Sequence, residues 1–145
     1  MNSLPSQFKI LGIDPGITNG FALALVNIVD KTIEWKVWEI HIDEFSLHLG
    51  VHEPDIVVIE DFILRPDKRT EFMNKGFTSL ETAKLVGRAE QWCYEHGRVC
   101  SIAQASDKKF AYSLLGETYV KGKKNMHKMD AKAHARHYIR KRWVF

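Results

Sequence analysis

Three acidic segments, far apart in the chain, carry the residue types that hold a divalent cation. Asp14 and Glu60 each follow an apolar run that predicts a buried strand. A carboxylate at such a position is costly to remove from water unless a positive charge lies beside it. His127 and Asp130 lie one helical turn apart in the third segment. Together the segments predict a metal site for phosphodiester cleavage.

Each of these four residues also has a purely structural interpretation. Asp14 can form a turn with the Pro-Gly that follows it, and Glu60 can pair with one of the cations shortly after it. Asp130 can complement the dipole of a helix, and His127 can be a neighbour of the helix cap. The combination of all three segments favours the metal site over these alternatives.

Two nearby titratable residues are left outside the predicted site. Asp61 is interpreted as an outward-facing or capping acid. His134 lies one turn beyond Asp130 on the same helix face, and we interpret it as a histidine on the helix surface.

The charge of +3 is distributed unevenly along the 145 residues. Residues 1–107 contain 10 basic and 16 acidic residues, a net charge of −6, whereas residues 108–145 contain 11 and 2, a net charge of +9. A basic segment on an acidic body indicates a polyanionic partner, nucleic acid before membrane. The alternative is a solvated helix face. The cations that we expect to contact phosphates flank the acidic motifs: Arg65, Lys68 and Arg69 after Glu60, and Lys121, Lys123 and Lys124 before His127.

Length and composition predict one domain spanning residues 1–145. No apolar run approaches the roughly 18 to 20 residues that cross a membrane, and the N-terminus lacks the pattern of a secretion signal. Cys93 and Cys100 have no zinc-finger partners nearby, so reduced thiols are expected. These features predict a cytoplasmic protein without a membrane partner.

Hydrophobic periodicity divides the chain into alternating elements. Turn residues and helix caps set the limits of each element. Strands are expected at 8–13, 21–28, 31–42, 55–59 and 99–103. Helices are expected at 43–52 with Asp43 as cap, at about 80–96, from Ser106 or Asp107 to 115, and from about 127 to 142.

Three antiparallel strands followed by strands that alternate with helices predict an α/β protein. The order is that of the ribonuclease H-like fold, a central mixed five-stranded sheet flanked by helices. In this fold the first and fourth strands are neighbours. Asp14 and Glu60 would then lie side by side, and the last helix would bring Asp130 against them.

The motifs themselves resemble one family. The segments Leu11–Gly16, Val57–Glu60 and His127–Ala131 are similar in order and spacing to those of the RuvC family of Holliday-junction resolvases, and most similar to its shorter bacteriophage members. The similarity extends from Phe8 to about Tyr138.

The resemblance implies a role for each matching residue. Asp14 matches the aspartate that such enzymes place between two Mg²⁺ ions, Glu60 matches the glutamate of the fourth strand, and Asp130 matches the acid of the last helix. His127 falls where members carry Asp or His, as a metal ligand or a general acid/base. Lys109 is matched to a lysine that approaches the scissile phosphate. No phenylalanine falls securely at the family's base-stacking position.

The function that the resemblance implies is metal-dependent endonuclease cleavage of branched DNA. A homodimer, formed through the helix at about 80–96, would nick four-way junctions symmetrically during DNA recombination and repair, leaving 5′-phosphate and 3′-hydroxyl ends. Mg²⁺ is the expected cofactor, with Mn²⁺ as a substitute. The alternatives are a ribonuclease H-type nuclease acting on RNA–DNA hybrids or single strands and, with less support, a binding module without catalysis.

Overall fold

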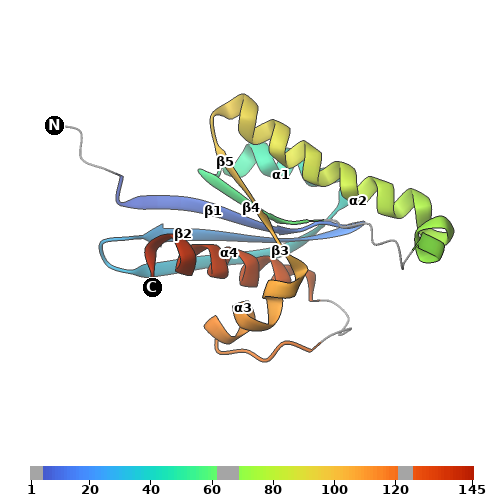
Figure 1. Ribbon diagram of the computed structural model, residues 1–145. Helices are drawn as coiled ribbons and strands as arrows, with labels where there is room; N and C mark the ends of the chain where they lie inside the picture. Colours follow the sequence, from blue (N-terminus) through green and yellow to red (C-terminus); the bar gives the residue numbers. More distant parts are fainter. Residues whose placement is uncertain (1–4, 62–68, 121–125) are drawn as a thin grey trace.

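The computed structural model describes residues 5–61, 69–120 and 126–145, with the backbone alone for residues 69–79. Five strands form one mixed sheet in the order β3-β2-β1-β4-β5. The first three strands pair antiparallel, while β4 is parallel to both β1 and β5 (Figure 1). The predicted mixed five-stranded sheet is therefore confirmed. Its strands are β1 (Gln7–Asp14), β2 (Thr18–Asn27), β3 (Thr32–His41), β4 (Ile56–Glu60) and β5 (Val99–Ala103).

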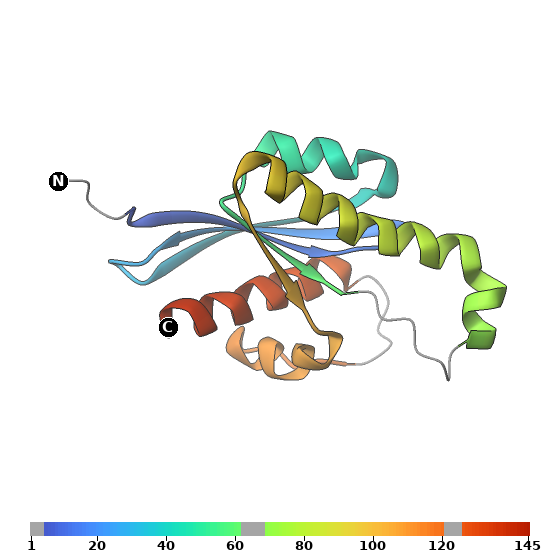
Figure 2. The ribbon, with the colours of Figure 1, turned by 45° about the horizontal axis from the view of Figure 1, so that its top comes forward.

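Helices cover both faces of this sheet. The helices α1 (Phe45–His52) and α2 (Arg69–His96) lie on one face. The helix α4 (His127–Trp143) lies on the other face, with α3 (Lys108–Leu114) packed beside it (Figure 2). Two core clusters follow from this arrangement, one on each face. Among the described helices, none is long and apolar enough to cross a membrane.

Strand alternation decides which face receives the acidic residues. In β1, Leu11 and Ile13 belong to the core beneath α2, whereas Ile10 belongs to the core beneath α4. Successive side chains of a strand point to opposite faces, so Asp14 shares the α4 face with Ile10. In β4, Val58 lies on the α4 face and brings Glu60 to the same side.

Two glycines let α4 approach the sheet closely. A Cβ atom at Gly12 would lie 2.2 Å from the backbone oxygen of Ala131, and one at Gly20 would lie 1.9 Å from that of His127. No side chain fits at either place, because both neighbours are helix backbone. The first turns of α4 therefore rest directly on β1 and β2.

The element limits differ from the sequence prediction by one residue in several elements and by more in three places. The helix α2 begins at Arg69 rather than near residue 80, since no proline follows Pro66 and most of the intervening residues tolerate a helix. The strand β2 begins at Thr18, within the predicted turn. A short 3₁₀ helix at Ile42–Glu44 precedes α1, so Asp43 does not cap α1.

Candidate metal centre

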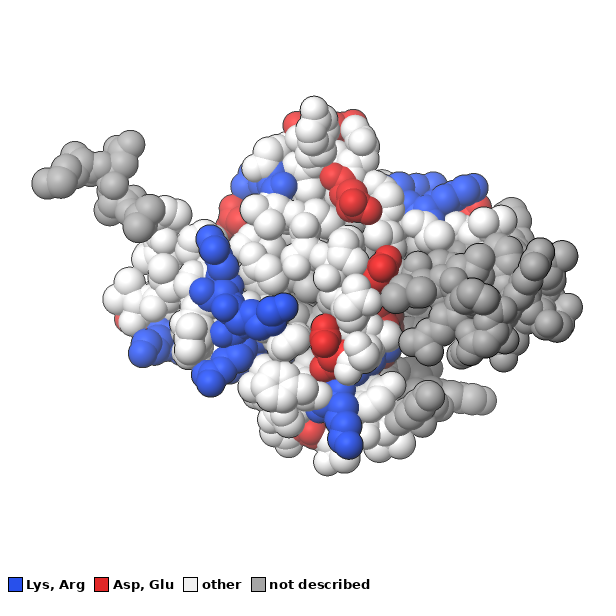
Figure 3. Space-filling model, viewed as in Figure 1, with Lys and Arg blue, Asp and Glu red and all other residues white. Residues whose placement is uncertain are grey.

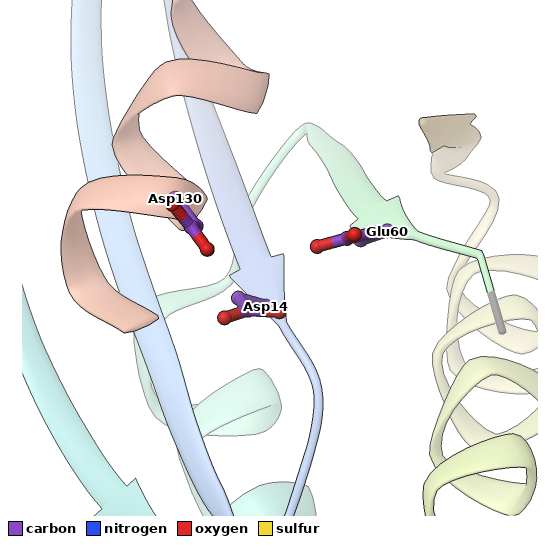
Figure 4. A group of neighbouring side chains, drawn as sticks. All are labelled: Asp14, Glu60 and Asp130. Carbon is purple, nitrogen blue, oxygen red and sulfur yellow. The ribbon is translucent and has the colours of Figure 1, made fainter. Parts of the chain in front are cut away.

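The ends of three elements bring three carboxylates together. Asp14 is the last residue of β1, Glu60 is the last residue of β4, and Asp130 lies in the first turn of α4. One carboxylate oxygen from each lies within 4.8 Å of those of the other two. Figure 4 shows the three side chains converging on one point. Parallel pairing places Ile13 beside Ile59, so the next residues, Asp14 and Glu60, lie side by side at the carboxyl ends of the two strands.

Asp14 is buried and is hydrogen-bonded to a histidine. Its Oδ2 accepts a hydrogen bond from Nδ1 of His127 at 2.8 Å. Burial raises the pKa of Asp14 to about 6; the hydrogen bond from His127 opposes this rise, and the charge of Glu60 adds to it. The same hydrogen bond raises the pKa of His127, whose side chain is 45% exposed.

Glu60 has a contact on each carboxylate oxygen. Nζ of Lys108 lies 3.1 Å from Oε1, and Nε2 of His134 lies 3.3 Å from Oε2. Burial alone would raise the pKa of Glu60, but the contact with His134 and the charge of Lys108 outweigh burial and lower the pKa to about 2. Glu60 is therefore ionised at neutral pH.

Asp130 is held by two groups from α3. Nζ of Lys108 lies 3.2 Å from Oδ2, and the hydroxyl of Tyr112 donates a hydrogen bond of 2.5 Å to Oδ1. Burial and the bond to Asp130 raise the pKa of Tyr112. Burial opposes the charge on Lys108, but Glu60 and Asp130 together raise its pKa. Lys108 thus remains protonated and bridges two of the three acids.

The arrangement fits a divalent cation. Lys108 carries one positive charge beside three crowded carboxylates, and burial, with the charge of Glu60 adding to it, raises the pKa of Asp14. Oε2 of Glu60 is buried and lacks a hydrogen bond among the described residues. Hard carboxylate oxygens from three rigid elements are the ligands that Mg²⁺ and Mn²⁺ take.

The predicted site residues are brought together, whereas most of the predicted phosphate contacts are not placed. Asp14, Glu60, Asp130 and His127 lie in one cluster. Lys109 lies at the start of α3 with an exposed side chain. Outside the described residues or side chains are Arg65, Lys68, Arg69, Lys121, Lys123 and Lys124.

Three residues of the cluster were not predicted to belong to it: Lys108, Tyr112 and His134. Lys108, rather than its neighbour Lys109, contacts the acids. The helical period could have distinguished Lys108 from Lys109, because Lys108 lies four residues before the buried Tyr112 and therefore shares its face of α3. The prediction that His134 lies on the helix surface is wrong, since its side chain is fully buried against Glu60. Its spacing of four residues from Asp130 places it on the same helix face as the site, and this spacing could have indicated its burial there.

Comparisons with known proteins were made by sequence and by structure. No protein-family model matches the sequence, and no curated protein matches it. T. thermophilus RuvC in complex with a Holliday junction substrate superimposes with a TM-score of 0.60 at 15% identity, covering 92% of this chain and 95% of that one. The fowlpox virus Holliday junction resolvase gives 0.62 at 13% identity, covering 92% and 98%. Its complex with Holliday junction DNA gives 0.52 at 16%, covering 92% and 97%.

These likenesses extend over nearly the whole of each chain. At such low identities they establish the fold, which this chain shares with RuvC and with the fowlpox virus resolvase. The predicted α/β, ribonuclease H-like fold is thereby confirmed. The resemblance to the RuvC family, first indicated by three short motifs, is confirmed at the level of fold.

Proposed function

We propose that this chain is one nuclease domain that cuts Holliday junctions and other branched DNA. The observation that carries the proposal is the convergence of Asp14, Glu60 and Asp130, with ligand atoms within 4.8 Å of one another. They meet in a fold shared with two junction resolvases of known structure. Metal-assisted hydrolysis of a phosphodiester uses such a rigid cluster of carboxylates.

The residues of the cluster divide the work between charge and position. Asp14, Glu60 and Asp130 would hold Mg²⁺, and two bound ions would supply an activated water and stabilise the leaving 3′-oxygen. Lys108 holds Glu60 and Asp130 in place and adds a positive charge where the phosphate must approach. His127 is about half exposed and either joins the metal ligands or holds a proton beside Asp14. The products would be nicks with 5′-phosphate and 3′-hydroxyl ends.

The cations of α4 supply a surface for DNA beyond the cluster. Four of them recur every fourth residue along one side of the helix, and among these Arg136 donates a hydrogen bond to the main-chain oxygen of Phe145 at 2.7 Å. Figure 3 shows Lys and Arg gathered on the side of the molecule where α4 ends. Phosphate contacts from such a surface make binding fall steeply with salt. The four are Lys128, Lys132, Arg136 and Arg140.

Symmetric nicking of a four-way junction requires two sites related by a two-fold axis. We propose that a homodimer forms through residues 80–96 of α2. Two large side chains of this segment are exposed in the single chain, Leu80 at 51% and Tyr94 at 84%. Burying them against a second copy would remove apolar surface from water.

A cleavage panel tests the proposal directly. The purified protein is incubated in Mg²⁺ or Mn²⁺ with a four-way junction, a flap, a linear duplex, single-stranded DNA and an RNA–DNA hybrid. We expect paired nicks in the junction that DNA ligase reseals, and no cleavage in EDTA. Preference for the hybrid or the single strand would contradict the proposal and support a ribonuclease H-type nuclease.

Two matched variants assign any cleavage to this cluster. Asp14→Asn removes one carboxylate without changing its size, so cleavage should vanish while junction binding in a gel-shift assay survives. Asp61→Asn changes an acid next to Glu60 but outside the cluster and should leave cleavage intact. Cleavage that persists in Asp14→Asn would refute the metal-site assignment.

A further inference from the structure

The side chain of His134 is a buried polar group at the cluster that the proposed chemistry does not use. It comes from α4 one turn after Asp130, and its side chain is 0% exposed. Its Nε2 lies 3.3 Å from Oε2 of Glu60, yet neither ring nitrogen makes a full hydrogen bond with a described residue. Burying an imidazole in this way costs free energy that an apolar side chain of the same volume would not. A role at the site accounts for that cost.

The two oxygens of Glu60 are fixed by different neighbours. Lys108 holds Oε1 and is shared with Asp130, whereas His134 is the described residue in contact with Oε2. Removing His134 would leave the terminal torsion of Glu60 free to turn, because that torsion is broad in any carboxylate. A ligand that turns must be ordered again each time a metal ion binds.

We propose that His134 is a positioning residue that fixes the carboxylate of Glu60 toward Asp14 and Asp130. Nε2 of His134 faces the carboxylate, which can only accept, so the tautomer that fits this contact carries its proton on Nε2. The inference rests on the proposed function, because it gives His134 a purpose only if Glu60 holds a metal ion. Hydrogen-bonded groups behind a metal ligand typically change affinity or activity by about 10- to 100-fold.

The test compares two substitutions of His134 with a control in the same helix. His134→Leu keeps the volume and removes the polar atoms, whereas His134→Gln places an amide nitrogen near the position of Nε2. Ile139→Val is the control, since it loosens the core beneath α4 without touching the cluster. The first measurement is Mn²⁺ binding by calorimetry without DNA, and the second is kcat and KM for junction nicking.

We expect His134→Leu to weaken Mn²⁺ binding and to lower kcat by about 10-fold or more, with KM for the junction unchanged. His134→Gln should recover most of both quantities, and Ile139→Val should change neither. A purely structural histidine would leave Mn²⁺ binding and kcat unchanged in a folded His134→Leu protein, which would overturn the proposal.

The two proposals fail differently. If the wild type binds Mn²⁺ but nicks no junction, the proposed function fails while the binding comparison still decides the role of His134. If His134→Leu does not fold, His134→Gln and His134→Asn decide instead. Only Gln reaches the Nε2 position, so equal Mn²⁺ affinity in Gln and Asn would overturn the positioning role.

Discussion

Replacing Asp14 by Asn should stabilise the metal-free protein while abolishing its cleavage. Asp14 is 8% exposed, and its pKa is raised from an ordinary value of 3.8 to about 6. At a pH above both pKa values, Asp14 is ionised in the folded and in the unfolded protein, and its ionisation costs more free energy in the folded protein. The difference corresponds to about 3 kcal/mol. Asn resembles the uncharged form of Asp14 and escapes this cost, so the free energy of unfolding should rise by up to about 3 kcal/mol.

The pH dependence of this gain has a defined sign. A group whose pKa is higher in the folded protein destabilises that state once pH exceeds the unfolded value, and does so fully above the folded value. The advantage of Asp14→Asn should therefore be full above pH 6 and should disappear as pH falls below 3.8. Urea unfolding followed by tryptophan fluorescence, in EDTA at pH 8 and pH 5, measures it.

Bound metal should reverse the order of stability of the wild type and Asp14→Asn. A metal ion that binds only the folded state stabilises it by RT ln(1 + [L]/Kd), and the wild type offers one more carboxylate to such an ion. Adding Mg²⁺ should raise the midpoint of the wild type more than that of the variant. Asp61→Asn should show neither effect. A variant that is less stable than the wild type in EDTA at pH 8 would refute the reasoning, because Asp14 would then be stabilising in its ionised form.

Three further predictions follow from contacts in the structure. Lys108→Met leaves Glu60 and Asp130 without their shared cation, so unfolding in EDTA should become easier by about 3 kcal/mol, and Mg²⁺ should restore part of that loss in a urea titration. Gly20→Ala forces a Cβ atom against the helix backbone, so calorimetry should show a loss of about 3 kcal/mol together with slower nicking. Tyr94→Lys places a charge on the exposed face of α2 and should shift sedimentation from dimer to monomer; an unchanged sedimentation coefficient would argue against that interface.

Much of the fold could be predicted from the sequence because its elements carry local signals. The strand period of two, read outward from Ile10 and Ile56, already places Asp14 and Glu60 on one face of the sheet. Topology then requires the last helix to cover that face. The start of α2 at Arg69 was missed because charged, loop-like residues also tolerate a helix, and nothing in the sequence marks its first turn.

The rest of the site depends on contacts that no local pattern specifies. Lys108 and Lys109 are adjacent and chemically identical, and helix phase selects Lys108 only once Tyr112 is known to be the residue of α3 that contacts Asp130. His134 looks like a surface histidine in a basic helix until Glu60 is placed opposite it. The sequence predicts Gly20 to be a turn residue, whereas in the structure its lack of a side chain lets the backbone of His127 pack against β2. In each of these cases the role of the residue depends on tertiary contacts rather than on local secondary-structure propensity.

The close packing of α4 against Gly12 and Gly20 affects when the site can form during translation. During translation the sheet and its paired acids emerge first, and Asp130 follows only with the last helix described. Until that helix docks, Asp14 and Glu60 lack their third carboxylate, and Lys108 lacks one of its two partners. In a nascent chain, the proposed metal centre would therefore be complete only after α4 has emerged and docked on the sheet.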